Sequence, residues 1–318
     1  MKRKIVMRPI EEEPDIFNGL AICLTNKCNM DCTYCSRNSG IGRSECLSLQ
    51  TVLATLDFFN SKRPNQRKYL QLTGGEIFTY PDIFSVIEYA IEKGFICRLQ
   101  TNGLLLKRAV QKRPELLSSK QVVIKVSLDG WDEHTHGLYR GVETFQPIVA
   151  GVKAALSVNP NVALKTVIHE ENFDRIGRML DFCLKIGVKG WSYNTLMKLG
   201  RSSKVTAITE LMIAEKLVPL YNRAKYCRLL NGSNVQVYKW MQTQRLNCWP
   251  PFFFVNYDGR IFVTDKTIDE RLVGSVFGRN LEEEFVYNEK TVDLGTLTVS
   301  SEVLDYVANH LRVEIERR

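Results

Sequence analysis

The segment LTNKCNMDCTYC, residues 24–35, carries the strongest signal in the sequence. It places Cys28, Cys32 and Cys35 with three and then two residues between them, directly after an apolar run. Three thiolates at this spacing can hold a [4Fe–4S] cluster and leave its fourth iron open. A structural zinc site needs four ligands; Cys46 is the only local candidate for a fourth, and the first histidine is His134. The spacing favours a cluster, with structural zinc and unrelated buried thiols as alternatives.

The composition is that of a soluble globular protein. The chain has 318 residues, of which 44% are hydrophobic and 25% charged, close to the average for soluble domains. No apolar run approaches the roughly 18 residues that cross a bilayer, and the N-terminus has no signal-peptide pattern. Nine cysteines, an odd number without an export signal, predict reduced thiols. We therefore expect a cytoplasmic protein with no membrane partner.

The net charge of +8, from 43 basic and 35 acidic residues, is mildly positive. The basic residues are scattered and form no dense block, which favours an ordinary solvated surface over a nucleic-acid interface. An anionic substrate is the remaining functional interpretation of this charge.

Short apolar runs alternate with amphipathic segments over the first 200 residues. The expected strands are Leu20–Leu24, Tyr69–Leu72, Ile96–Gln100, Val122–Leu128, Ala163–Ile168 and Gly190–Asn194. The expected helices are Leu49–Phe59, Pro81–Glu92, Thr144–Leu156 and Asn172–Ile186. Such alternation predicts a parallel sheet, and six units are fewer than the eight of a complete barrel. We therefore expect an α/β fold, a partial (β/α)6 TIM-like barrel over residues 1–200.

The alternation of short apolar runs with amphipathic segments ends after about residue 200. Residues 201–234 are expected to form a helical connection, because Ile208–Leu230 is strongly helical in pattern. Residues 235–318 are expected to form a small α+β extension. In it, Asp258-Gly259 between two apolar runs predicts a hairpin, and the tail from Ser300 predicts a terminal helix.

The cysteine segment resembles the signature of the radical S-adenosylmethionine (SAM) superfamily, and Thr73-Gly74-Gly75-Glu76 resembles its GGE motif. The resemblance implies that SAM binds the open iron. It also implies that an external donor such as flavodoxin or ferredoxin reduces the cluster. Cleavage of SAM then gives a 5′-deoxyadenosyl radical, which abstracts hydrogen from a C–H bond.

The resemblance also implies a set of SAM contacts at the ends of the strands. It places Tyr34 near the adenine, and Gly74, Gly75 and Glu76 at the amine. The other implied contacts are Asn102 in a strand-end turn, Ser127 and Asp129 at the ribose and carboxylate, Arg140 at the carboxylate, and Leu196 at the adenine. For Tyr34, Asn102 and Arg140 the purely structural alternatives are a core aromatic, a plain turn and a surface ion pair.

The C-terminal region is loosely similar to the SPASM and twitch extensions of the superfamily, which bind auxiliary clusters. Only Cys227 and Cys248 follow residue 200, and Thr264-Asp265 stand where the family has Pro-Cys. We therefore expect no conventional auxiliary cluster. Cys248 is either a buried structural thiol or a hydrogen-atom donor to a substrate radical, and Cys227 is the second candidate for that role.

Three functions remain open from the sequence. The first is radical chemistry on a peptide or natural-product precursor, by epimerisation or by C–H functionalisation and cross-linking. The second is an epimerase, dehydrogenase or dehydratase of an aminosugar, nucleoside or other small metabolite. The third is a non-catalytic iron–sulfur or zinc module.

Overall fold

The fold was analysed in a computed structural model of the chain. It describes residues 3–7, 19–62, 68–196, 200–201, 208–221, 223–231, 252–264, 271–275 and 313–317. The candidate hydrogen donor Cys248 and most of the predicted extension lie outside these residues.

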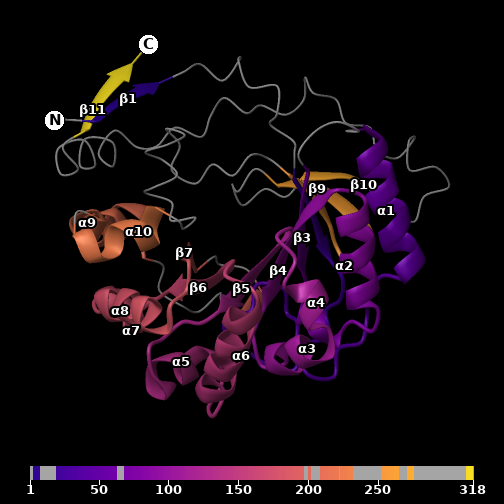
Figure 1. Cartoon of the computed structure of the whole chain (residues 1–318), viewed down its shortest axis with the longest axis horizontal. Coiled ribbons are helices and arrows are strands. Elements are labelled where there is room, and N and C mark those ends of the chain that lie inside the picture. The colour runs from indigo at the N-terminus through magenta and orange to yellow at the C-terminus, as the bar shows by residue number, and fades with distance from the viewer. Residues whose placement is uncertain are drawn as a thin grey trace.

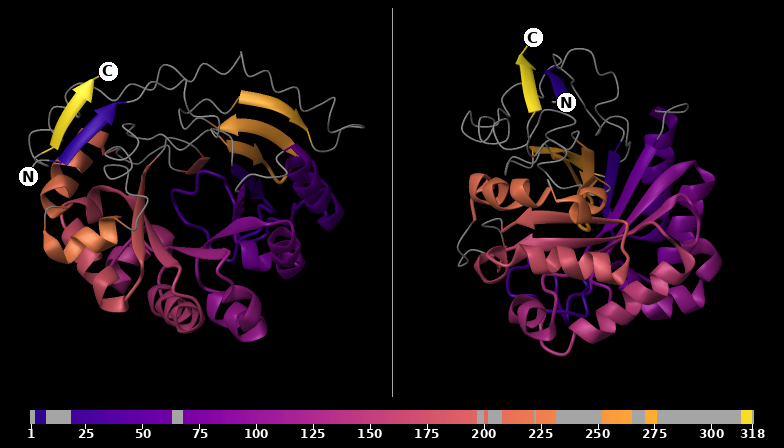
Figure 2. Two further views of the ribbon diagram at one scale, coloured as in Figure 1. Left: turned by 45° about the horizontal axis from the view of Figure 1, so that its top comes forward. Right: turned by 60° about the vertical axis from the view of Figure 1, so that its left-hand side comes forward.

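A curved sheet forms the centre of the molecule (Figures 1 and 2). Its six sequence-predicted strands are all present and pair in parallel in chain order. They are β2 (Gly19–Cys23), β3 (Lys68–Thr73), β4 (Phe95–Thr101), β5 (Val122–Ser127), β6 (Val162–Ile168) and β7 (Gly190–Thr195). The prediction of an open, partial α/β barrel is therefore confirmed.

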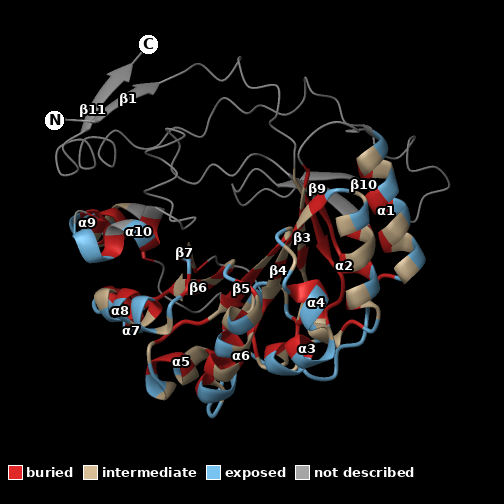
Figure 3. Ribbon diagram, viewed as in Figure 1, coloured by how far each residue is buried: buried red, intermediate tan, exposed pale blue. Residues whose placement is uncertain are grey.

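Helices cover the outer side of this sheet, and Figure 3 shows their buried residues turned towards the strands. They are α1 (Leu49–Lys62), η2 (Ile77–Thr79), α2 (Ile83–Glu92), α3 (Leu106–Lys112), α4 (Pro114–Leu117), α5 (Glu133–Arg140), α6 (Phe145–Val158), α7 (Glu170–Phe173) and α8 (Ile176–Ile186). None of the described helices is long and apolar enough to cross a membrane.

Local signals explain where several helices start and stop. The Ser48 hydroxyl accepts a hydrogen bond from the Thr51 N–H at 3.1 Å and so caps α1 as predicted. Gly187 ends α8 with φ 85°, a left-handed conformation that favours glycine. Helix α5 was not predicted, although Asp132 caps it by accepting a bond from the Thr135 N–H at 2.8 Å.

Alternate residues of each strand face opposite sides of the sheet. In β4, Cys97 and Leu99 are fully buried in the core shared with the helices, whereas Ile96, Arg98 and Gln100 are half-buried. These half-buried residues therefore face away from the helices. We call this side of β3–β7 the inner face.

The C-terminal part extends the same sheet. β8 (Phe252–Val255) pairs in parallel with β2, and β9 (Arg260–Thr264) pairs antiparallel with β8, so the predicted hairpin is confirmed. β10 (Arg271–Ser275) continues the sheet beyond β9. Because β8 joins the edge at β2, the described part of the sheet has seven parallel strands, one more than predicted.

Two short helices follow β7, as the pattern of the connection predicted: α9 (Glu210–Tyr221) and α10 (Ala224–Asn231). The terminal helix expected from Ser300 does not include the last described residues. There β11 (Val313–Arg317) pairs in parallel with β1 (Arg3–Met7). Val313 and Ile315 alternate with Glu314 and Glu316, which is the two-residue period of a strand.

Candidate active site

The sequence-predicted site residues meet at the carboxyl edge of the parallel sheet, the edge at which barrel enzymes build their active sites. The cysteine segment follows β2. The glycine motif ends β3, Asn102 follows β4, Ser127 ends β5 and Leu196 follows β7. The side chain of Cys227, on α10, is outside the described part of the chain.

The three cysteines of the segment are half-buried free thiols. Burial raises the pKa of Cys28 to about 12, and the Asn102 amide nitrogen lies 3.6 Å from its sulfur. Burial also raises the pKa of Cys32, while the Arg140 guanidinium acts in the opposite direction. This set of three thiols without a histidine fits an iron–sulfur cluster better than it fits zinc.

Among the described residues, no three His, Cys, Asp or Glu side chains converge on one point as ligands of a single metal ion would. A cubane does not require this convergence, because each thiolate binds a different iron atom. The arrangement of the three thiols on one loop is therefore compatible with a cluster.

The glycine motif lets the end of β3 touch the start of the cysteine segment. The Gly75 N–H donates to the Thr25 carbonyl at 2.7 Å, and the Glu76 N–H donates to the Lys27 carbonyl at 2.9 Å. A Cβ at Gly75 would lie 2.1 Å from the Lys27 oxygen, and one at Gly74 2.6 Å from the Thr25 oxygen. The close approach that requires these glycines is therefore made to the protein's own backbone.

Glu76 is fully buried, and its carboxylate is already bonded within the protein. It accepts hydrogen bonds from the Thr101 hydroxyl at 2.7 Å, the Asn102 N–H at 2.6 Å and the Phe78 N–H at 3.1 Å. Burial raises its pKa, and these three donors act in the opposite direction. The carboxylate thus ties the end of β3 to the end of β4 and presents no exposed atom to an amine.

Asp129 and Arg140 form a buried ion pair beneath the cysteine segment. The Arg140 Nε lies 2.6 Å from the Asp129 Oδ2, and the two side chains are 9% and 0% exposed. The Tyr34 hydroxyl donates to the same Asp129 oxygen, and the Val167 N–H donates to the other at 2.8 Å. Burial alone would raise the pKa of Asp129, but Arg140 outweighs it and holds the pKa below its usual range.

The C-terminal end of α5 holds the cysteine segment in place. The Tyr139 carbonyl accepts hydrogen bonds from the Thr33 N–H at 2.9 Å and from its hydroxyl at 3.3 Å. The Cys32 sulfur lies 4.0 Å from the Arg140 carbonyl. The predicted ligand contacts Tyr34, Asp129 and Arg140 are therefore also the residues that fix the loop.

Arg201 is a site residue that sequence reasoning missed. Its Nε donates to the Cys32 carbonyl at 2.9 Å, its guanidinium donates to the Ser39 carbonyl at 2.8 Å, and its N–H donates to the Cys35 carbonyl. It lies 169 residues from Cys32 in the chain, so no local pattern could have identified it. Ser127 is half-buried at the end of β5, and Leu196 is 7% exposed.

Gly75→Ala is expected to destabilise the fold by about 1–3 kcal/mol, as overpacking does, because the new Cβ would strike the Lys27 carbonyl. Gly137→Ala is the matched control, since a Cβ there meets nothing closer than 3.6 Å. Urea unfolding of both variants would measure the difference. Equal stability of Gly75→Ala and the wild type would contradict the close-approach explanation.

Arg140→Met is expected to cost about 3–5 kcal/mol of unfolding free energy, because it leaves Asp129 buried without its counter-charge. Lys216→Met is the control, since it breaks the exposed Lys216–Asp174 pair of 3.0 Å, worth about 0–1 kcal/mol. Denaturant titrations followed by circular dichroism would compare them. Similar small losses of unfolding free energy in both variants would show that the buried pair stabilises the fold no more than the exposed pair does.

The chain is similar in sequence to a known protein family and to several known proteins. The radical SAM superfamily profile matches residues 22–183, slightly more than half of the chain. The AdoMet-dependent heme synthase of Methanosarcina barkeri is 25% identical over 182 residues, covering 57% of this chain and 51% of that protein. The antilisterial bacteriocin subtilosin biosynthesis protein AlbA of Bacillus subtilis is 25% identical over 190 residues, 59% of this chain and 41% of that protein.

A probable GTP 3',8-cyclase of Saccharolobus islandicus is 28% identical over 183 residues, 57% of this chain and 55% of that protein. The chain thus spans about half the length of the curated relatives it matches.

Solved structures share the fold at low identity. Native anSMEcpe with bound AdoMet and Cp18Cys peptide has a TM-score of 0.68 at 15% identity, covering 93% of this chain and 84% of that one. Streptococcus suis SuiB bound to precursor peptide SuiA has a TM-score of 0.65 at 14% identity, covering 85% and 64%. With the cysteine segment at the carboxyl edge of the partial barrel and the profile match across its core, the chain belongs to the radical SAM superfamily.

Proposed function

We propose that this chain is an enzyme that removes a hydrogen atom from a C–H bond of a peptide or natural-product precursor. The observation that carries the proposal is the loop of Cys28, Cys32 and Cys35, fixed at the carboxyl edge by β3, α5 and Arg201. These cysteines would hold the [4Fe–4S] cluster to which SAM would bind. When bound, the reduced cluster and SAM supply a 5′-deoxyadenosyl radical.

In this proposal, the side chains of Glu76, Asp129 and Arg140, which are bonded within the protein, are not the main contacts of SAM. Because Glu76 has no exposed atom, the contact with the SAM amine falls to the backbone carbonyls of Gly74 and Gly75. Ser127 is half-buried at its strand end and suits a ribose contact. Asp129 and Arg140 orient Tyr34 and the cysteine loop, and the backbone at Leu196 is left for the adenine.

A peptide substrate is favoured by what the similar proteins act on or bind. AlbA is a bacteriocin biosynthesis protein, SuiB is seen with a precursor peptide and anSMEcpe with a peptide. The second candidate is a small metabolite, favoured by equally similar heme synthases and GTP cyclases. A non-catalytic iron–sulfur or zinc module is the third. An external electron donor such as flavodoxin or ferredoxin is required for either enzymatic function.

The fate of the substrate radical depends on Cys248. If this thiol faces the substrate, its S–H bond breaks and its hydrogen atom bonds to the carbon radical on the face opposite the abstraction, which inverts the stereocentre. The thiyl radical left on sulfur then takes an electron from the external donor and a proton from water. Without such a donor, C–H functionalisation or cross-linking is the favoured outcome.

Replacing Cys28, Cys32 and Cys35 together with Ala is expected to abolish iron binding and 5′-deoxyadenosine formation. Cys46→Ala is the control, because Cys46 is exposed and lies just after the same loop. Anaerobic reconstitution followed by iron, sulfide and 5′-deoxyadenosine assays would check both variants. A full complement of iron in the triple variant would refute the cluster assignment, and zinc in colourless wild-type protein would favour the non-catalytic module.

Cys248→Ala is expected to keep 5′-deoxyadenosine formation and to lose inverted product. In D2O the wild type is expected to place one deuterium on the product, read by mass spectrometry. Cys227→Ala serves as the comparison, since it removes the other cysteine beyond residue 200. Full epimerising activity in the Cys248 variant would remove its role as donor.

A further inference from the structure

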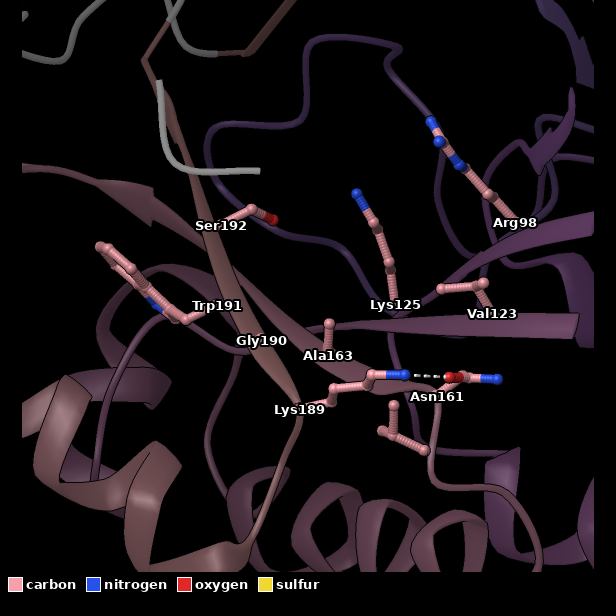
Figure 4. A pocket seen from close by; sticks show the side chains of 10 residues that line it. Arg98, Val123, Lys125, Asn161, Ala163, Lys189, Gly190, Trp191 and Ser192 are labelled. Atoms are coloured by element: carbon pink, nitrogen blue, oxygen red, sulfur yellow. Dashed lines mark hydrogen bonds between the residues drawn. The ribbon is translucent and has the colours of Figure 1, made fainter. Parts of the chain in front are cut away.

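A cavity of about 210 Å³ opens on the inner face of the sheet, along the first halves of β4–β7. Arg98, Lys125, Ala163 and Ser192 line it (Figure 4). Their strand neighbours Cys97 and Ile124 belong to the core beneath the helices. The cavity is therefore on the side of the sheet that the helices do not cover. It is smaller than the roughly 300–1,000 Å³ of a pocket for a whole drug-sized ligand, so it suits one functional group of a larger molecule.

The lining of this cavity is positively charged. Arg98, Lys125 and Lys189 contribute to it, and no Asp or Glu is among the described residues that line it. Lys125 is only 6% exposed. The Arg98 guanidinium lies 4.6 Å from the centre of the Tyr69 ring, which orients it, and Lys189 donates to the Asn161 amide oxygen at 2.7 Å. Such a lining selects anionic oxygen atoms, for which guanidinium and ammonium groups are charge-assisted donors.

Ser192 gives an independent indication of a ligand. Its side chain is 5% exposed, and its hydroxyl has no hydrogen-bond partner. Figure 4 shows it projecting from β7 into the space that Lys125 enters from β5. Native proteins rarely leave a buried polar atom unsatisfied. An anionic oxygen between Ser192 and Lys125 would accept this hydroxyl's hydrogen bond.

The cavity is connected to the catalytic edge through neighbouring strand residues. Lys125 precedes Ser127 by two residues on the same strand, a rise of roughly 7 Å. Ser127 pairs with Lys165, which in turn pairs with Ser192. A group held in the cavity would therefore place the rest of its molecule beside the predicted SAM site.

We propose that this cavity is the specificity pocket of the enzyme and that it binds a carboxylate of the substrate, the side chain of an Asp or Glu residue of the peptide. Lys125 and Arg98 supply the charge, and Ser192 donates a hydrogen bond. The inference rests on the proposed function, because the peptide supplies the carboxylate. A phosphate group shares the same chemistry and would come from a small metabolite instead.

Two measurements on the reconstituted full chain test the proposal. The first is calorimetric titration with glutarate, with inorganic phosphate and with uncharged glutaramide. Glutarate is expected to bind the wild type, and glutaramide is not. Lys125→Gln is expected to weaken glutarate binding about tenfold or more, and Ser192→Ala by about threefold or more. Lys153→Gln, on the exposed surface of α6, is expected to change nothing.

The second measurement selects binders from a library of random displayed peptides. The wild type is expected to enrich Asp or Glu at one fixed position, and Lys125→Gln is expected to lose that preference. Ser192→Ala provides a nearly isosteric variant, so the proposal remains testable if Lys125→Gln fails to load iron.

The outcomes separate this inference from the proposed function. Absence of anion binding to the wild type, or unchanged binding in both pocket variants, overturns the pocket whatever the substrate. If phosphate binds but glutarate does not, and no acidic peptide position is enriched, the proposals of a carboxylate ligand and of a peptide substrate are both overturned. The anion site would then support a small-metabolite substrate. Glutarate binding together with an acidic peptide position supports both.

Discussion

The carboxyl edge of this protein depends on one buried ion pair. Asp129 follows the end of β5 and is fully buried. A buried carboxylate is stable only when it is paired and fully hydrogen-bonded. Arg140 from α5, the Tyr34 hydroxyl from the cysteine segment and the Val167 N–H from β6 together satisfy it. A buried hydrogen-bond network with unsatisfied groups destabilises the folded state. These elements must therefore assemble together. The cysteine loop is thereby held in place by contacts within the protein.

Most of the fold could be predicted because its signals are local. Each parallel strand is a short apolar run bounded by turn residues, so Val122–Leu128 was predicted almost as β5 has it. Glycine stops and hydroxyl caps also depend on neighbours in the chain. The errors lie where distant pairing decides: β8 joins β2 across more than two hundred residues of chain, and β11 finds its partner at the opposite terminus. Helix α5 was missed because its short segment contains Gly137 and because the residues that it buries, Thr135, His136 and Arg140, are polar.

The structure brings the described candidate site residues to one edge of the sheet, but the sequence could not say what each side chain contacts. A motif identifies a residue type at a strand end; it does not say which neighbouring group satisfies it. For Glu76 and Arg140, which the motifs place near SAM, the structure adds bonds within the protein: Glu76 bonds to Thr101 and Asn102, and Arg140 bonds to Asp129. Arg201 was not found at all, because only the folded chain brings it to the cysteine loop. Predicting these contacts requires the three-dimensional packing.

The charged residues at the carboxyl edge differ in their surroundings from those on the inner face of the sheet. At the carboxyl edge, the charged side chains of Glu76, Asp129 and Arg140 are bonded within the scaffold. On the inner face, Arg98, Lys125 and Lys165 interrupt strands that would be almost continuously apolar in an ordinary parallel sheet covered on both sides. Arg98, Lys125 and Lys165 lie on three adjacent strands, and Ser192, whose hydroxyl has no hydrogen-bond partner, pairs with Lys165 on the next strand. This placement of positive charge beside an unsatisfied donor suits the anionic group that we propose for the cavity.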